Sequence, residues 1–181
     1  GSLDPVSVKK KITSKTKAIL LVHQFGMPAD MKSIMEIAKS YDIKVIEDCA
    51  QAHAAKYDDQ YVGTIGDIGV FSLNVNKSIQ AGEGGVCVTN SEDLAYRLKL
   101  IRNHGESVVG PAGYKDIMNI AGFNYRLSEI HAAIAREQLK KLDDLNTIRI
   151  ELIEELSCGL KNYPFLSTPS NNEISQSTYY V

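Results

Sequence analysis

Hydrophobic residues along this chain fall into short runs separated by amphipathic stretches. Residues 18–25 and 44–49 are apolar runs whose density is typical of strands buried on both faces. Between them, Asp30 is placed to cap a helix that ends near Asp42, because apolar side chains recur there at helical spacing. A strand, a helix and a strand in this order predict a right-handed parallel crossover, so the expected fold class is α/β.

Two more apolar runs, residues 68–73 and 85–89, predict a second pair of strands. The connection between these runs is short and rich in glycine, and it leaves no room for the helix that a parallel crossover needs. We therefore expect the second pair to be antiparallel. The expected sheet is mainly parallel, with one antiparallel strand.

Helical patterns dominate the second half of the chain. One helix is capped by Asn90 or Ser91 and ends near Gly105. A single long helix is expected from Ser128 to about Cys158, because apolar residues follow one stripe of it. The apolar positions of the two helices are Leu94, Leu98 and Ile101 in the first, and Ile130, Ile134, Leu142, Leu145, Ile148, Leu152 and Leu156 in the second.

Two stretches follow neither a helical nor a strand period. Residues 106–122 are rich in glycine, which predicts a long loop of the kind that usually has a function. Beyond the long helix, turn-forming prolines and asparagines precede residues 177–181, which are a candidate start of a further strand.

Composition and charge narrow the class of protein. The 181 residues include 20 basic and 22 acidic ones, so the formal net charge of −2 gives no general attraction for nucleic acid or an anionic membrane. The hydrophobic share of 44% is that of an ordinary globular domain. Because no apolar run is long enough to span a membrane and the N-terminus does not resemble a secretory signal, a cytoplasmic location is expected.

Cysteine and histidine indicate neither a metal site nor a disulfide framework. Neither residue type shows the close spacing of a zinc site, and the odd number of distant cysteines is expected to consist of buried thiols. The residues concerned are Cys49, Cys87, Cys158, His23, His53, His104 and His131.

Two motifs suggest nucleotide binding, and both fail on inspection. Gly63, Gly66 and Gly69 precede a predicted strand, whereas the dinucleotide fingerprint follows its strand and has a different spacing. Residues 76–78 resemble the end of a phosphate-binding loop, but Asn76 stands where that motif requires glycine.

Three polar residues lie at predicted strand ends. Asp48 ends one parallel strand, and Ser72 and Lys77 lie at or just beyond the end of another, so all three can converge at the carboxyl edge of the sheet, where open α/β sheets bind ligands. A buried, hydrogen-bonded acid and a solvated lysine are the alternative roles. Taken together, a lysine amine can form a Schiff base with a carbonyl cofactor, and an acid can keep a pyridinium nitrogen protonated.

Several motifs in unbroken order extend this picture. They are AILLVHQFGMPADM, KVIEDCAQAHAA, VGTIGDIGVFSLNVNKSIQAGEGGVCVTN, RNHG and FNYRLSEIHAA, and the match runs from about Pro5 to Leu160. This series resembles the DegT/DnrJ/EryC1/StrS family of sugar aminotransferases. Members of that family are pyridoxal 5'-phosphate (PLP) enzymes of fold type I, related to aspartate aminotransferase.

The resemblance implies roles for five residues. Lys77 aligns with the lysine that holds PLP as a Schiff base and moves a proton, and Asp48 with the acid that pairs with the pyridine nitrogen. Gln51 resembles a glutamine near the cofactor ring, and Ser72 a serine that hydrogen-bonds the phosphate. Asn124 matches an asparagine that reaches the phosphate of the neighbouring subunit, so a homodimer is implied. Further candidates for the substrate pocket, for which structural roles are equally open, are His23, His53, Glu83 and Arg126.

The resemblance also divides the chain into two parts. Residues 1–140 match the central part of the PLP-binding large domain, and residues 141–181 match a long linking helix and the start of the C-terminal small domain. The family's N-terminal portion, which supplies early strands and an aromatic residue that stacks on the cofactor, has no match in this sequence. We therefore expect a fragment or truncated form that is weak or inactive by itself.

The implied reaction is amino transfer, usually from glutamate, to the keto group of a nucleotide-linked sugar or a cyclitol. One alternative is a catalytically inactive remnant that acts only by self-association through exposed strand edges and the long helix. Another alternative lies within the family, whose sugar dehydratases carry histidine in place of the lysine, and Lys77 argues against it.

Overall fold

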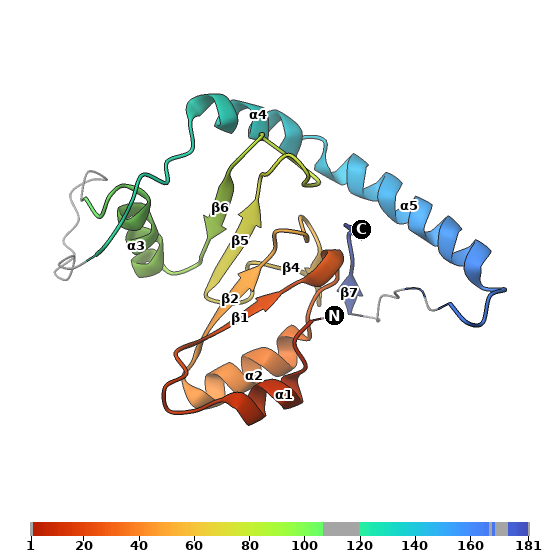
Figure 1. The fold of residues 1–181 in the computed structure, drawn as a ribbon, viewed down its shortest axis with the longest axis horizontal. Coiled ribbons are helices and arrows are strands. Elements are labelled where there is room, and N and C mark those ends of the chain that lie inside the picture. Colours follow the sequence, from red (N-terminus) through yellow and green to blue (C-terminus); the bar gives the residue numbers. More distant parts are fainter. Residues whose placement is uncertain (1, 107–119, 167, 169–173, 181) are drawn as a thin grey trace.

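The computed structural model, which describes residues 2–106, 120–166, 168 and 174–180, is built around a four-stranded sheet (Figure 1). In spatial order the strands are β1 (Ala18–Val22), β2 (Lys44–Asp48), β5 (Ile68–Ser72) and β6 (Gly85–Val88). β1, β2 and β5 are parallel, whereas β6 is antiparallel to β5. Both pairings confirm the predictions from the sequence.

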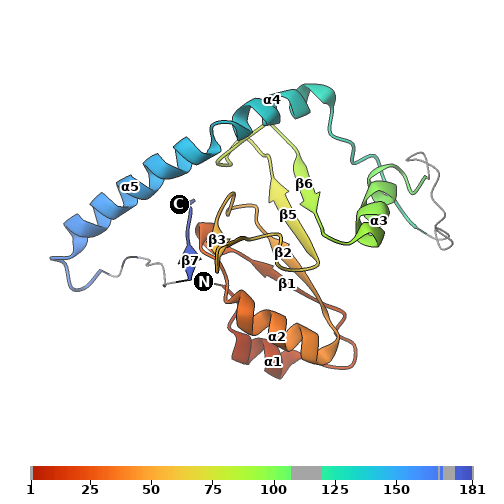
Figure 2. The same ribbon diagram turned by 180° about the vertical axis from the view of Figure 1, so that it is seen from behind.

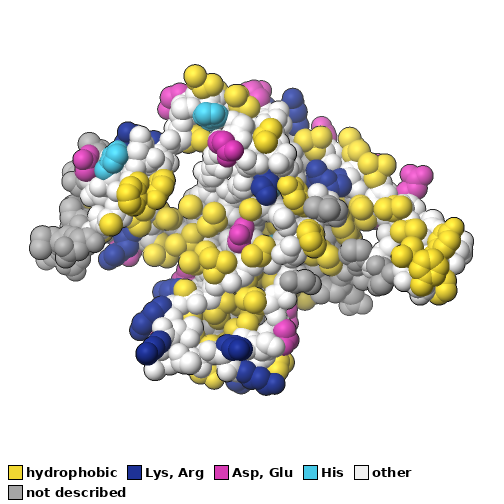
Figure 3. Space-filling view, viewed as in Figure 1, with side chains coloured by type: hydrophobic (Ala, Val, Ile, Leu, Met, Phe, Trp, Pro, Cys, Tyr) yellow, Lys and Arg dark blue, Asp and Glu magenta, His cyan; other side chains and the backbone are white. Residues whose placement is uncertain are grey.

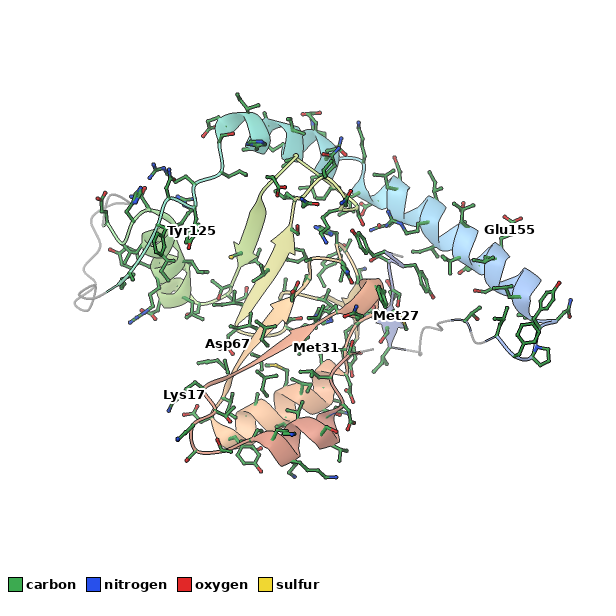
Figure 4. All side chains as sticks on the ribbon, in the orientation of Figure 1. Lys17, Met27, Met31, Asp67, Tyr125 and Glu155 are labelled. Carbon is green, nitrogen blue, oxygen red and sulfur yellow. The ribbon has the colours of Figure 1, made fainter. Side chains whose placement is uncertain are left out.

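Two helices cover one face of β1 and β2 (Figure 2). They are α1 (Pro5–Lys11) and α2 (Met31–Tyr41), and the predicted cap of α2, Asp30, accepts a hydrogen bond from the Ser33 N–H at 3.1 Å. Met31 points from the start of α2 toward the sheet (Figure 4). The core between helices and sheet includes Ile19, Leu21, Met31, Ile34, Ala38, Val45 and Cys49.

β1 is buried on one face only. Ile19 and Leu21 point into the core beneath the helices, whereas Leu20 between them is 59% exposed. Successive side chains of a strand alternate between faces, and on the second face Ala18 and Leu20 are exposed while Val22 is half-buried. The prediction that this strand is buried on both faces is therefore wrong.

The long helix predicted from residue 128 to 158 is two helices. α4 is Glu129–Leu139 and α5 is Leu142–Leu160, with a break at residues 140–141. The break places Leu142 in a second, smaller core with Leu73 and Ile79 of the β5–β6 connection. The helix breaks where Leu142 packs against residues distant in sequence, and such a contact cannot be inferred from hydrophobic periodicity.

The predicted apolar stripes of the later helices pack less than expected. α5 extends away from the sheet (Figure 1), and Ile148, Leu152 and Leu156 are each more than half exposed. Hydrophobic side chains lie open along it in the space-filling view (Figure 3). In α3 (Glu92–Arg102) the buried residues are Tyr96 and Leu100 rather than the predicted set, and Ile101 is exposed.

A small second sheet was not predicted. It consists of β4 (Gln60–Tyr61), β3 (Lys56–Tyr57) and β7 (Ser175–Gln176), all antiparallel. Asp58 and Asp59, the two residues between β3 and β4, both take positive φ, as a tight hairpin turn requires. The sequence suggested the start of a strand at residues 177–181. The strand β7 lies just before these residues, and residues 177–180 are in no strand.

Three remaining predictions have mixed outcomes. Cys49 is buried, but Cys87 and Cys158 are exposed, so the expectation of buried thiols is wrong for two of the three. Most of the loop predicted over residues 106–122 lies outside the described residues. Among the helices that the structure describes, none combines the length and apolar character needed to cross a bilayer.

Candidate active site

The parallel strands end together at one edge of the sheet. Asp48, the last residue of β2, pairs with Val70 of β5, two residues before Ser72. The opposite, amino edge is marked in Figure 4 by Lys17 and Asp67. The structure therefore brings Asp48 and Ser72 to the carboxyl edge, as the sequence predicts.

The Asp48 carboxylate is half-buried and has few partners. Its Oδ1 accepts one hydrogen bond from the backbone N–H of Ala50 at 2.9 Å. Within the described part of the chain, it forms no ion pair. A carboxylate has about four acceptor positions, so this side chain keeps capacity for a ligand's protonated nitrogen.

The neighbouring acid, Glu47, has the opposite environment, which sequence reasoning missed. Strand alternation turns it into the core, where it is 0% exposed. Its oxygens accept from His23 Nε2 at 3.0 Å and from the backbone N–H groups of Gly63, Ile65 and Gly66 at 2.8, 2.9 and 2.6 Å. Burial alone would raise the pKa of Glu47, but these hydrogen bonds outweigh burial and hold the pKa below its ordinary value. We call these five residues the Glu47 centre.

The Glu47 centre is a hydrogen-bonded scaffold. His23 Nδ1 accepts from the backbone N–H of Ala29 at 3.0 Å, so the ring proton lies on Nε2 and is donated to Glu47. His23, Glu47 and Cys49 bring potential metal ligands within 4.8 Å of one another. However, burial raises the pKa of the Cys49 thiol, and the nearby negative charges of Glu47 and Asp48 raise it further. Because the histidine and glutamate atoms already form hydrogen bonds within the protein, we assign the cluster a structural role.

Lys77 lies in the loop that joins β5 to β6. The loop is closed by backbone hydrogen bonds of 2.9 Å from Lys77 N to the Asn74 carbonyl and from Val75 N to the Gly82 carbonyl. The half-buried Lys77 side chain places Nζ 4.9 Å from the centroid of the Tyr180 ring. No carboxylate of the described residues forms an ion pair with it, so its amine is not committed to an internal salt bridge.

Ser72 and Gln51 lie at the same edge. The side-chain hydroxyl of Ser72 accepts from the backbone N–H of Asn74 at 3.3 Å. The backbone carbonyl of Ser72 accepts from His53 Nε2 at 2.8 Å. Gln51, in the loop after β2, accepts from the backbone N–H of Phe25 at 2.8 Å through its side-chain oxygen. Gln51 thus ties the loop after β2 to the loop after β1.

Asn124 does not join this group within one chain. It forms an isolated antiparallel bridge with Asn103, just after α3, and its side-chain oxygen accepts from the Arg126 N–H at 3.4 Å. The adjacent Tyr125 lies beside α3 in Figure 4, whereas the β5–β6 loop approaches the junction of α4 and α5. A role for Asn124 at the cofactor phosphate therefore stays a prediction that requires a second subunit.

The four further candidates for a substrate pocket all have partners inside the chain. Arg126 donates to the side-chain oxygen of Asn103 at 2.6 Å, and Glu83 accepts from the side chain of Asn74 at 2.9 Å. The two histidines are buried and hydrogen-bonded as described above. Structural roles account for the observed contacts of all four.

His53 carries an unsatisfied atom at this edge. Because Nε2 donates to the Ser72 carbonyl, the ring proton lies there and Nδ1 is an acceptor, which is buried without a hydrogen-bond partner among the described residues. Burial lowers the pKa of His53, and the charges of Lys77 and Arg149 lower it further against the opposing hydrogen bond to Ser72. The edge therefore contains a neutral imidazole, and no described group donates a hydrogen bond to its Nδ1 atom.

This set of side chains fits the chemistry of PLP. A phosphate requires donors, which the Ser72 hydroxyl and the amides of the glycine-rich loop can provide. A pyridine nitrogen requires an acid with acceptor capacity, and the Asp48 carboxylate has it. An aldehyde requires an amine without a fixed anionic partner, and the Lys77 amine meets that condition.

The fold and this edge place the chain in the class of PLP-dependent transferases of fold type I, in agreement with the fold class predicted from the sequence. Its structure matches DesV of S. venezuelae, solved in complex with a ketimine intermediate, with a TM-score of 0.89 and 35% identity over 99% of this chain and 47% of that one. The sequence model of the DegT/DnrJ/EryC1/StrS aminotransferase family matches residues 1–181. The chain belongs to this family.

Individual relatives act on several sugars. The chain is 44% identical to the GDP-perosamine synthase of Escherichia coli O157:H7, over 81% of this chain and 39% of that protein. It is 44% identical to a dTDP-3-amino-3,6-dideoxy-alpha-D-galactopyranose transaminase of Aneurinibacillus thermoaerophilus, over 93% and 45% of the two chains. A similar fold, with a TM-score of 0.85 and 30% identity over 99% of this chain and 49% of that one, occurs in an E. coli GDP-4-keto-6-deoxy-D-mannose-3-dehydratase with bound hydrated PLP. This chain spans somewhat less than half the length of the curated relatives it matches.

Proposed function

We propose that this chain carries the cofactor-binding edge of a PLP-dependent aminotransferase that transfers an amino group, from glutamate, to a keto group of a nucleotide-linked sugar or a cyclitol. The observation that carries this proposal is the presence of an acid with spare acceptor capacity, Asp48, and an amine without an ion-pair partner among the described residues, Lys77, at the ligand-binding edge of a family fold.

The residues of this edge divide the work. When bound, PLP supplies an electron sink that stabilises negative charge on the carbon next to the amino group. Asp48 would accept the hydrogen bond of the ring's protonated nitrogen and keep it protonated. Ser72 would hold the phosphate, and Gln51 would order the loop beside the ring. Lys77 would hold the cofactor at its aldehyde carbon, and its amine would carry the proton between the reacting positions.

The substrate class is supported by the names of the relatives. They include transaminases of dTDP-linked sugars and an L-glutamine:2-deoxy-scyllo-inosose aminotransferase of Streptoalloteichus tenebrarius, 36% identical over 99% of this chain and 44% of that protein. Nucleotide sugars and a cyclitol thus fall within one family. Lys77 favours amino transfer over the dehydratase branch.

A cytoplasmic location and division into residues 1–140 and 141–181 remain predictions.

A homodimer is part of this proposal. Asn124 forms a bridge with Asn103, just after α3, and its expected role is at the phosphate of a partner subunit. The apolar side chains of Ile148, Leu152 and Leu156 lie open on α5, which supports burial of this face against another surface. The same observation supports the second candidate function, a non-catalytic chain that acts by self-association.

Trapping of the cofactor separates the two candidates. The chain is incubated with PLP, reduced with borohydride and digested, and the modified peptide is identified by mass. We expect one adduct, on Lys77, which Lys77→Ala abolishes. Lys56→Ala is the matched control, because Lys56 also stacks on a tyrosine ring, with Nζ 5.0 Å from the centroid of Tyr61. A folded chain that forms no adduct would favour self-association.

A further inference from the structure

Two polar residues of α5 reach back to the carboxyl edge of the sheet. Asn146, which is buried, donates from Nδ2 to the His53 carbonyl at 3.0 Å, and His53 in turn donates to the Ser72 carbonyl at 2.8 Å. Arg149, one turn further along α5, donates from Nη1 to the Asn146 side-chain oxygen at 3.1 Å. His53 thus links α5, which it contacts through its backbone carbonyl, to the strand end that carries Ser72, which it contacts through its ring.

Arg149 also contacts the loop that carries Lys77. Its Nη1 lies 3.2 Å from the hydroxyl oxygen of Ser78, which is buried and directly follows Lys77. A guanidinium is always charged, and hydrogen bonds from charged donors are stronger than neutral ones. Arg149 therefore contacts the residue after Lys77 directly and is linked to Ser72 through Asn146 and His53.

The C-terminal segment holds the other side of Lys77. The Thr178 carbonyl accepts from Arg149 Nη1 at 3.4 Å. Two residues later, the Tyr180 hydroxyl donates to the Asn76 carbonyl at 2.6 Å, and the Tyr180 ring lies 4.9 Å from Lys77 Nζ. Both sequence neighbours of Lys77 are thus held by contacts from outside the loop.

We infer that His53, Asn146 and Arg149, which we call the α5 brace, are positioning residues that fix Lys77 relative to Ser72. The inference rests on the proposed function, because one cofactor must then meet Ser72 at its phosphate and Lys77 at its aldehyde carbon. Residues that hold such groups act through them and need not touch the reacting atoms. The brace sets the spacing between the two ends of the cofactor site.

The surroundings of α5 support positioning over general stabilisation. Leu142 is the apolar residue of α5 that is buried in the second core, and the C-terminal part of the helix leaves the body of the molecule (Figure 1). The main core, beneath α1 and α2, includes no residue of α5. Loss of the brace is therefore expected to loosen the Lys77 loop and to leave the main core intact.

Hydrogen exchange without PLP tests the brace directly. In Arg149→Met, which keeps the length of the side chain and removes its charge, the amides of Val75, Lys77 and Ala81 should exchange about tenfold faster than in the unaltered chain. The amides of Gly63 and Ile65 in the Glu47 centre should not change. Arg136→Met, at an exposed position of α4, is the matched control.

A second set of measurements connects the brace to the cofactor. Arg149→Lys should restore part of the loop protection, and Ser78→Ala should reproduce a smaller version of the loss while Arg149 stays in place. The apparent Kd for PLP, from adduct yield on Lys77 against PLP concentration, should rise about tenfold in Arg149→Met and less in Arg149→Lys.

The outcomes separate the brace from the proposed function. Unchanged exchange of the loop amides in both Arg149→Met and Ser78→Ala would overturn the brace, as would equal acceleration of the loop and the Glu47 centre. A brace that protects the loop without altering the Kd for PLP would overturn its role in cofactor positioning. If the unaltered chain forms no adduct, the proposed function fails, and the exchange result alone decides whether the brace holds the loop.

Discussion

Glu47 and Asp48 are adjacent carboxylates on one strand, yet the structure uses them in opposite ways. Glu47 faces the core, and four donors fill its acceptor positions. Asp48 faces the edge of the sheet and accepts one backbone hydrogen bond. The contrast shows that hydrogen-bond saturation, together with burial, separates an acid that holds the fold from an acid that is available to a ligand.

Removal of the Glu47 carboxylate should give the largest effect. In Glu47→Ala, the His23 ring proton and the backbone N–H groups of Gly63, Ile65 and Gly66 lose their acceptor inside the core. We expect the free energy of unfolding to fall by about 3–5 kcal/mol, measured by urea denaturation. In the control Glu83→Ala, an exposed acid with one hydrogen bond to Asn74, the change should stay within about 0.5 kcal/mol. Equal losses in the two variants would contradict the assigned role of Glu47.

A methyl group at Gly69 should disturb the same centre from another side. A Cβ at this position would collide with the backbone of Gly63, whose N–H donates to Glu47. We expect Gly69→Ala to cost about 1–3 kcal/mol in thermal or urea unfolding. The control is Gly159→Ala, in α5, where nothing lies within 4 Å of the added methyl and a gain of up to about 1 kcal/mol is expected. A neutral Gly69→Ala would show that Gly63 can move without loss.

The two regions should respond to acid in different pH windows. The pKa of Glu47 is held below its ordinary value of about 4.3, so its contribution is present above that pH and is lost as pH falls toward the folded-state pKa. The pKa of His53 is lowered from about 6.5, mainly by burial, so below pH 6.5 the unfolded chain binds protons more readily and stability falls. The His53 slope is at most about 1.4 kcal/mol per pH unit.

Histidine variants test whether His53 causes the loss of stability below about pH 6.5. His53→Gln should flatten the dependence of unfolding free energy on pH below about pH 6.5, and His104→Asn, which replaces a histidine at an exposed site, is the control. The quantity to compare is the slope and not the absolute stability, because His53→Gln also alters packing. A slope that persists in His53→Gln would assign the proton uptake to another group.

Local signals in the sequence were sufficient for the sheet and for the edge of the site. The glycine-rich connection predicted the antiparallel β5–β6 pair, and the strand ends predicted that Asp48 and Ser72 meet. The helix break at residues 140–141 was missed because burial of Leu142 against Leu73 depends on contacts distant in sequence. The β3–β4 hairpin had a readable signal, the turn-forming pair Asp58-Asp59, which was overlooked.

Neither the Glu47 centre nor the α5 brace could be predicted from the sequence, and the reason is the same for both. The sequence shows Glu47 next to Asp48, but which acid faces the core depends on the side that α1 and α2 cover. Arg149 lies more than seventy residues after Ser78. No periodicity or motif connects such distant residues, so only the folded chain reveals that they are hydrogen-bonded.

The most direct test of this division is Asp48→Asn, with stability and PLP adduct yield measured on the same sample. The substituted amide side chain would keep the size of the original and its one backbone hydrogen bond, so unfolding free energy should change by no more than about 0.5 kcal/mol. Loss of the carboxylate charge should weaken PLP binding about tenfold or more. Destabilisation comparable to that of Glu47→Ala, with the adduct on Lys77 retained at full yield, would contradict the account.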